Sequence, residues 1–134
     1  MILFPITVVI DSNEKKKILI IEDNIESQLI LKVYLKELYD VNITGDAESG
    51  IELLTKNVYD LLLLDINLPG KLNGEDVLIF LRNDTNLKVL PVIVITAYAL
   101  KVDREKFLSQ GANDYLAKPV EKLILREVVA KNLL

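Results

Sequence analysis

The sequence contains no cysteine and no histidine among its 134 residues. Without cysteine, disulfide bonds and thiolate metal sites are excluded, and a reducing, cytoplasmic location is the natural expectation. Without histidine, the chain has no imidazole general base, no Ser-His-Asp triad and no histidine-ligated zinc. Any bound metal ion must therefore be held by oxygen atoms, which points to Mg²⁺, Mn²⁺ or Ca²⁺.

The chain has fewer basic residues than acidic ones, 16 against 20, so the net charge is −4 and the pI is about 4.9. This balance argues against direct binding of nucleic acid. The apolar share of 51% and the length fit one globular domain. The apolar opening, residues 1–10, lacks a basic leading region and a cleavage site and is too short to cross a bilayer. We therefore expect no signal peptide and no membrane contact by this chain itself.

Short apolar runs alternate with helical patterns from residue 17 onward. Five strands are predicted: three are apolar runs of the kind that is buried in a sheet, and the second and fifth are short strands. Five helices are predicted between and after them; Asp46 caps the second and Gly111 ends the fourth. The predicted strands are 18–22, 39–44, 59–65, 91–96 and 113–118, and the helices are 24–38, 46–57, 75–83, 103–110 and 121–133. Such alternation predicts an α/β fold with a doubly wound, five-stranded parallel sheet.

Four of the predicted strands end in polar residues. The first ends in Glu22-Asp23, the third in Asp65, the fourth in Thr96 and the fifth in Lys118. Because the strands are expected to be parallel, these ends meet at one edge of the sheet, where ligands bind in open α/β folds.

Three clustered carboxylates repel one another, and a divalent cation relieves that repulsion. The oxygen-only donor set of Glu22, Asp23 and Asp65 favours Mg²⁺. A carboxylate at such a site can attack phosphorus, with a lysine and a hydroxyl to stabilise the transferred group. Asp65 is therefore the candidate nucleophile, and Lys118 and Thr96 are its candidate partners. Each residue alone fits an ordinary turn or helix start, and the hypothesis depends on their occurring together.

Four segments together resemble the receiver domain of two-component response regulators. ILIIEDN resembles its acidic strand and LLLLDINLPG its phosphoacceptor strand, while VIVITAYA and GANDYLAKP resemble the threonine and Lys-Pro strands. The resemblance implies a flavodoxin-like sheet of order 2-1-3-4-5. It divides the chain into an N-terminal extension or linker, residues 1–16, and a receiver domain, residues 17–134.

The resemblance also implies a role for each site residue. Asp65 would accept the phosphoryl group, and Mg²⁺ would be held by Glu22, Asp23, Asp65 and the backbone carbonyl of Asn67. Lys118 would pair with the phosphoryl group, Thr96 would be the switch hydroxyl and Tyr115 the switch aromatic. A cis bond at Lys118-Pro119 is implied too. The phosphoryl donor would be a histidine kinase or a histidine phosphotransfer protein, and a downstream protein would receive the signal.

Two departures from the family pattern are visible. The loop after Asp65 is one residue longer than its commonest form, with Gly74 nine positions on, and Gly70 and Lys71 are expected to absorb the extra residue. Tyr98 stands two positions after Thr96, and we hypothesise that it screens the acyl phosphate from water.

The helix predicted over 24–38 carries two apolar arcs. The wider one (Ile30, Leu31, Tyr34, Leu35 and Leu38) should face the sheet. The other consists of Ile25, Leu29 and Val33 on the opposite side. It is either ordinary scattered surface residues, a docking stripe for a helical phosphodonor, or a surface that residues 1–10 cover.

Several interpretations of the whole chain stay open. It is either a free-standing receiver or one excised from a hybrid sensor kinase. Apart from Mg²⁺-dependent self-phosphorylation and autodephosphorylation, no catalysis is expected. One rival is an aspartyl phosphatase, which usually needs a second acid where Asn67 stands. A flavin carrier would need a hydroxyl- and glycine-rich loop where EDNIES stands, and a degenerate receiver would lack part of the polar set.

Overall fold

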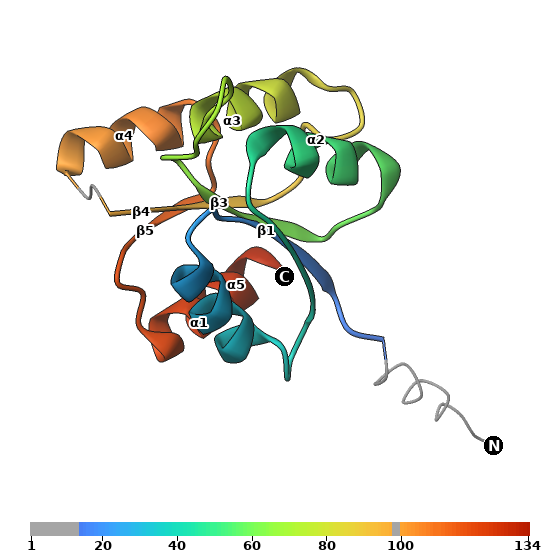
Figure 1. Ribbon diagram of the computed structural model, residues 1–134, viewed down its shortest axis with the longest axis vertical. Coiled ribbons are helices and arrows are strands. Elements are labelled where there is room, and N and C mark those ends of the chain that lie inside the picture. Colours follow the sequence, from blue (N-terminus) through green and yellow to red (C-terminus); the bar gives the residue numbers. More distant parts are fainter. Residues whose placement is uncertain (1–13, 98–99) are drawn as a thin grey trace.

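The computed structural model describes residues 14–97 and 100–134. It contains one parallel five-stranded sheet of order β2-β1-β3-β4-β5, which confirms the predicted fold and strand order. Helices α1 and α5 cover one face of the sheet, and α2, α3 and α4 cover the other (Figure 1). Every strand alternates with a helix along the chain, so each parallel pair is joined by a crossover.

The predicted and observed elements agree in number and type. The strands are β1 (Lys17–Ile21), β2 (Asp40–Thr44), β3 (Leu61–Asp65), β4 (Val92–Thr96) and β5 (Asp114–Ala117). The helices are α1 (Ile25–Leu35), α2 (Ala47–Lys56), α3 (Gly74–Asn83), α4 (Lys101–Ser109) and α5 (Lys122–Asn132).

The three central strands are apolar except for one terminal residue each, because helices cover both faces of the sheet. Alternate side chains of one strand point to opposite faces, so each run contributes to two cores. One core lies under α2, α3 and α4 and includes Leu19, Ile21, Leu62, Leu64, Val92 and Val94. The other lies under α1 and α5 and includes Ile18, Ile20, Leu61, Leu63, Ile93 and Ile95.

Polar side chains cap three helices where they begin. Asp46 accepts a hydrogen bond from the backbone N–H of Ser49 at 2.7 Å, which confirms the predicted cap of α2. Asn24 caps α1 in the same way, and Asn73 forms a reciprocal capping box with Asp76 at the start of α3. Asn24 and Asn73 follow the polar loops at the sheet edge, so these caps also fix where those loops end.

The prediction for the first helix was partly wrong. Helix α1 ends at Leu35, and Leu38 lies in the turn that follows, 48% exposed. Ile30 is 43% exposed because it borders a groove beside Pro119 rather than the sheet. Leu31 and Leu35 are buried against the sheet as expected, and Tyr34 packs at the edge of the same core.

Candidate functional site

The polar strand ends converge at one edge of the sheet, as the parallel topology requires. Asp65 is the last residue of β3 and pairs in register with Ile95, one residue before Thr96. Glu22 and Asp23 follow β1, the other neighbour of β3. Lys118 follows β5, and its backbone N–H donates to the carbonyl of Thr96 at 2.8 Å. Four strands therefore deliver side chains to a single place.

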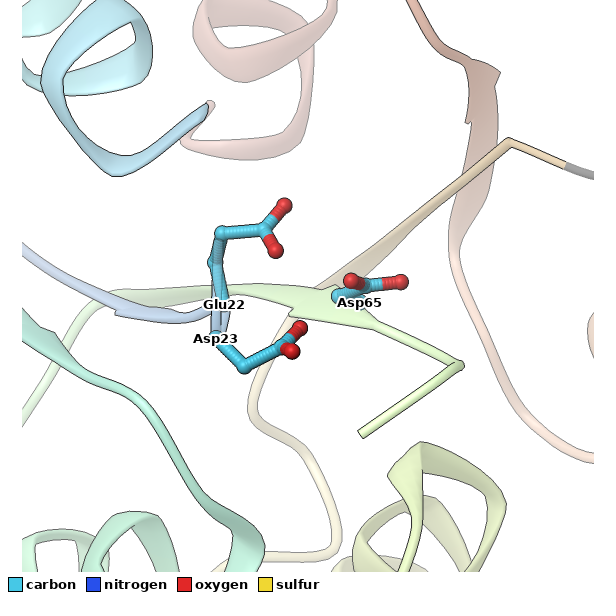
Figure 2. A group of neighbouring side chains, drawn as sticks. All are labelled: Glu22, Asp23 and Asp65. Atoms are coloured by element: carbon cyan, nitrogen blue, oxygen red, sulfur yellow. The ribbon is translucent and has the colours of Figure 1, made fainter. Parts of the chain in front are cut away.

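The three acidic residues lie close enough to share one cation. One carboxylate oxygen from each of Glu22, Asp23 and Asp65 lies within 4.8 Å of the others. Figure 2 shows Glu22 and Asp23 reaching from the end of β1 toward Asp65 on the neighbouring strand. Glu22 is fully buried and Asp65 is 4% exposed, whereas Asp23 is exposed to solvent. The cluster thus has a buried side and an open side.

Lys118 lies against the buried side of the cluster. Its ammonium forms ion pairs with Glu22 and, at 3.2 Å, with Oδ2 of Asp65. Burial alone lowers the pKa of Lys118, but the two carboxylates outweigh burial and hold the pKa above its usual value. Lys118 therefore remains a cation at neutral pH. The predicted cis bond between Lys118 and Pro119 is present.

Glu22 is the most strongly desolvated acid of the site. Burial raises the pKa of Glu22, and the negative charge of Asp65 adds to the rise. Lys118 and the backbone N–H of Asn24, which donates to Oε2 at 3.1 Å, oppose it. The net rise means that the anionic form of Glu22 is less well stabilised in this pocket than in water, mainly because the carboxyl group is buried.

Of the two candidate switch residues, Thr96 lies near Asp65 and Tyr115 lies in the core. The Asn67 backbone N–H donates to Oδ1 of Asp65 at 3.1 Å, and the Asn67 side-chain amide lies 3.4 Å from Oγ1 of Thr96. Tyr115 is buried in β5 and stacks on Phe107 with ring centroids 6.2 Å apart. Tyr115 is therefore packed inside the fold, and its role as the switch aromatic stays a prediction. The metal-binding role of the Asn67 carbonyl stays a prediction, and Tyr98 lies outside the described residues.

Two further residues shape the site, and sequence reasoning gave neither a role. Gly74 begins α3 against the end of β3, and its N–H donates to the carbonyl of Ile66 at 3.0 Å. A Cβ at this position would collide with the carbonyl oxygen of Asp65 and lie 2.6 Å from Cα of Ile66. Gln28 of α1 donates from its side-chain amide to the carbonyl of Glu22 at 2.6 Å. Of these two residues, only Gly74 could have been recognised in the sequence, as a glycine at the end of the polar loop that follows Asp65.

The donor set fits Mg²⁺. Three carboxylates supply hard oxygen ligands, and the exposed side at Asp23 leaves room for the water and phosphate ligands that Mg²⁺ keeps. The raised pKa of Glu22 points the same way, because a divalent cation would stabilise the anionic form of this buried carboxyl group.

Comparison with known proteins identifies the family. The family model described as "Response regulator receiver domain" matches residues 18–130. The chain belongs to the response regulator receiver family. Its acidic pocket of Glu22, Asp23 and Asp65 is consistent with Mg²⁺-dependent phosphoacceptor signalling.

Relatives of this receiver domain include both kinases and regulators. It is 35% identical over 122 residues to "Hybrid signal transduction histidine kinase I" of Dictyostelium discoideum, covering 85% of this chain and 7% of that protein. It is 38% identical over 113 residues to "Response regulator ArlR" of Staphylococcus saprophyticus, covering 82% of this chain and 50% of that protein. The receiver domain thus spans half or less of the length of these two relatives.

A solved relative carries the metal. The receiver domain of the sensor histidine kinase PA1611 from Pseudomonas aeruginosa is 33% identical, with a TM-score of 0.81 over 89% of this chain and 98% of that one. That structure has a magnesium ion coordinated in its active-site cleft. In the described part of the present receiver, none of the helices has the length and apolar character needed to cross a membrane.

Proposed function

We propose that this receiver domain is a phosphorylation-dependent switch in which Asp65 accepts a phosphoryl group from a phosphohistidine. The observation that carries the proposal is the position of the Asp65 carboxylate. It lies beside the carboxylates of Glu22 and Asp23 and 3.2 Å from the ammonium of Lys118. Asp65 is also one of the few charged side chains buried in the described chain. Such an arrangement suits the transfer of a negatively charged group to a carboxylate.

In the proposed reaction, an oxygen of Asp65 forms a bond to phosphorus as the N–P bond of the phosphohistidine breaks. The imidazole of the donor leaves with the electron pair of that bond and takes up a proton. Lys118 neutralises negative charge that develops on the phosphoryl oxygens. The Asn67 N–H holds Oδ1 of Asp65, so the carboxylate has a fixed orientation. Mg²⁺, held by Glu22, Asp23 and Asp65 with the Asn67 carbonyl, would supply further charge neutralisation when bound.

The phosphohistidine must lie outside these 134 residues because they contain no histidine. A groove of about 410 Å³ leads to the site between α1 and the segment after β5, and its lining includes Ile30, Tyr34, Pro119 and Lys118. This groove supports approach by the apolar side of a donor helix, from a histidine kinase or a histidine phosphotransfer protein.

The output would be a change of surface shape. A phosphoryl group on Asp65 adds acceptor oxygens near Thr96, which ends the neighbouring strand. Movement of Thr96 would alter the packing of Tyr115, and with it the face of α4, β5 and α5 that a downstream protein recognises. We expect a protein target and no direct contact with nucleic acid.

The test is to incubate the protein with Mg²⁺ and acetyl phosphate and to measure its intact mass. We expect a gain of one phosphoryl group that requires Mg²⁺ and is lost in base. Asp65→Asn keeps the shape of the side chain and removes the nucleophile, so this variant should gain no mass.

The rival functions predict different outcomes. Modification that persists in Asp65→Asn would refute the assignment of the acceptor. A degenerate receiver would gain no mass in the wild type either. Rapid continuous turnover of a small phosphoester would indicate a phosphatase instead.

A further inference from the structure

The outer face of α1 carries an apolar stripe. Ile25, Leu29 and Val33 are 66%, 59% and 52% exposed. They lie on the side of the helix opposite Leu31 and Leu35, which are buried against the sheet. No described residue covers the three. Single exposed aliphatic residues are normal, but a row of three at four-residue spacing forms a continuous surface along a helix.

The described chain begins next to this helix. Glu14 and Lys15 line a hollow of about 620 Å³ together with Lys32 of α1 and Lys36, the C-cap residue of that helix. The ammonium of Lys15 donates to the backbone carbonyl of Lys36 at 3.2 Å. The segment that precedes residue 14 is therefore tethered at the C-terminal end of α1, the end nearest Val33.

The tethered segment has the composition and length to cover the stripe. Residues 1–10, MILFPITVVI, contain no charged side chain and are apolar apart from Thr7. Ile25 and Val33 are eight positions apart, which corresponds to about 12 Å along the helix axis. Ten extended residues span about 33 Å. The segment can thus reach the whole stripe with its connection at residues 11–13.

We propose that residues 1–10 bind along the stripe of Ile25, Leu29 and Val33 and shield it from water. The tether favours this occupant over a second copy of the chain or a separate partner, because it holds the segment at a high effective concentration beside α1. Both surfaces are apolar, so contact removes both from water. The contact is independent of phosphoryl transfer and does not rest on the proposed function.

The lack of cysteine permits a direct test in the full chain. Thr7→Cys supplies a unique thiol for a nitroxide spin label, and paramagnetic broadening of ¹⁵N amide signals then reports which residues lie near position 7. We expect the amides at positions 29 and 33 to lose several-fold more intensity than that of Ile79, an exposed residue of α3 on the other face of the sheet. Leu29→Asp or Val33→Asp, both at exposed positions, should abolish the difference.

Ile79→Asp is the matched control, and it should leave the broadening of α1 unchanged. Equal broadening on α1 and α3, or none on either, would overturn the proposal. Broadening of α1 in a mixture of spin-labelled ¹⁴N chains and unlabelled ¹⁵N chains would show that a second copy is the occupant, and would overturn it too. Because the readout is structural, its failure would leave the role of Asp65 untouched.

Discussion

The carboxylate of Asp65 is held at both of its oxygens. Oδ1 accepts from the backbone N–H of Asn67 at 3.1 Å, and Oδ2 pairs with Lys118 at 3.2 Å. The first contact comes from the loop after β3 and the second from the segment after β5. Any change that moves either segment should therefore misdirect the acceptor without altering it chemically.

Gly74→Ala should impair the acceptor in this way. The added Cβ would collide with the carbonyl oxygen of Asp65 and approach Cα of Ile66 at 2.6 Å, and backbone atoms cannot rotate aside. We expect a loss of stability of about 1–3 kcal/mol in urea unfolding, the range for overpacking. Phosphorylation by acetyl phosphate should slow as well.

Gly45→Ala is the matched control because Gly45 lies at the same edge of the sheet. Its Cβ would meet Gln28 Nε2, Cα of Asp23 and the Glu22 carbonyl oxygen at 3.7–3.9 Å, which are ordinary contacts. This variant should keep both stability and phosphorylation close to the wild type. Equal effects of the two substitutions would show that the close approach at Gly74 is not the cause.

The difference between these glycines marks what the sequence can and cannot predict. The clustering of Glu22, Asp23 and Asp65 was predictable because parallel strands end at a common edge, and strand ends can be read from apolar runs. The tight fit of Gly74 was not, because it is a distance between the start of one helix and the end of one strand. Such distances depend on how elements pack and not on local patterns.

Between elements, α3 and α4 are joined by a small polar cluster. Glu75 in the first turn of α3 accepts from the side-chain amide of Gln110 at 2.8 Å and pairs with Lys106 at 3.1 Å. The hydrogen bond from Gln110 and, to a smaller extent, the contact with Lys106 lower the pKa of Glu75, although its partial burial opposes this. The cluster thus attaches α4, which belongs to the proposed output surface, to α3.

Glu75→Gln should therefore destabilise the protein in a pH-dependent way. A lowered pKa in the folded state means that the stabilisation is present above the unfolded-state pKa of about 4.5 and is lost as pH falls through the folded-state pKa. We expect the variant to lose about 1 kcal/mol at pH 7, a value typical of one hydrogen bond. The loss should vanish in acid, as measured by urea unfolding from pH 7 to pH 3.

Glu52→Gln provides the comparison. Glu52 pairs with Lys56 at 3.2 Å on the exposed face of α2, with both side chains about two-thirds exposed. Exposed pairs contribute at most about 0.5 kcal/mol, so this variant should show little change at any pH. A similar pH-dependent loss in both variants would mean that the α3–α4 contact is not responsible.

Some links between elements had no signal in the sequence. The guanidinium of Arg82, at the end of α3, donates to the backbone carbonyls of Gly111, Lys88 and Leu90 and to Oδ1 of Asn113. Burial lowers its pKa. Through these hydrogen bonds, the Arg82 side chain joins α3 to the loop before β4 and to the loop after α4. No spacing rule connects one arginine to carbonyls 6 to 31 positions away, whereas the strand pattern was strong enough to predict the sheet.

For the whole molecule, the acidic pocket opposes folding in the absence of metal. The pKa of Glu22 is raised by burial and by Asp65, so the folded state holds negative charge that the unfolded chain would separate. Binding of Mg²⁺ to the folded state alone should stabilise it in proportion to the logarithm of its concentration. The gain is about 2.7 kcal/mol at one hundred times the dissociation constant.

We therefore expect the melting temperature to rise with Mg²⁺ and the rise to shrink in Asp23→Asn. Asp23 is the exposed member of the cluster, so this variant should still fold. Glu105→Gln, at an exposed acid on α4 away from the cluster, should respond to Mg²⁺ like the wild type. Thermal denaturation over a Mg²⁺ titration at constant ionic strength measures all three, and an undiminished response in Asp23→Asn would contradict the assigned ligands.

The cation that faces the acids comes from the far end of the chain. Glu22 follows the first strand, while Lys118 follows the fifth, at the opposite side of the strand order. During synthesis on the ribosome, Glu22, Asp23 and Asp65 emerge before Lys118. A nascent chain that has docked its first four strands would hold a buried cluster of like charges with no counter-charge from the protein. Insertion of β5 thus completes the sheet and brings the counter-charge to the acids in the same step.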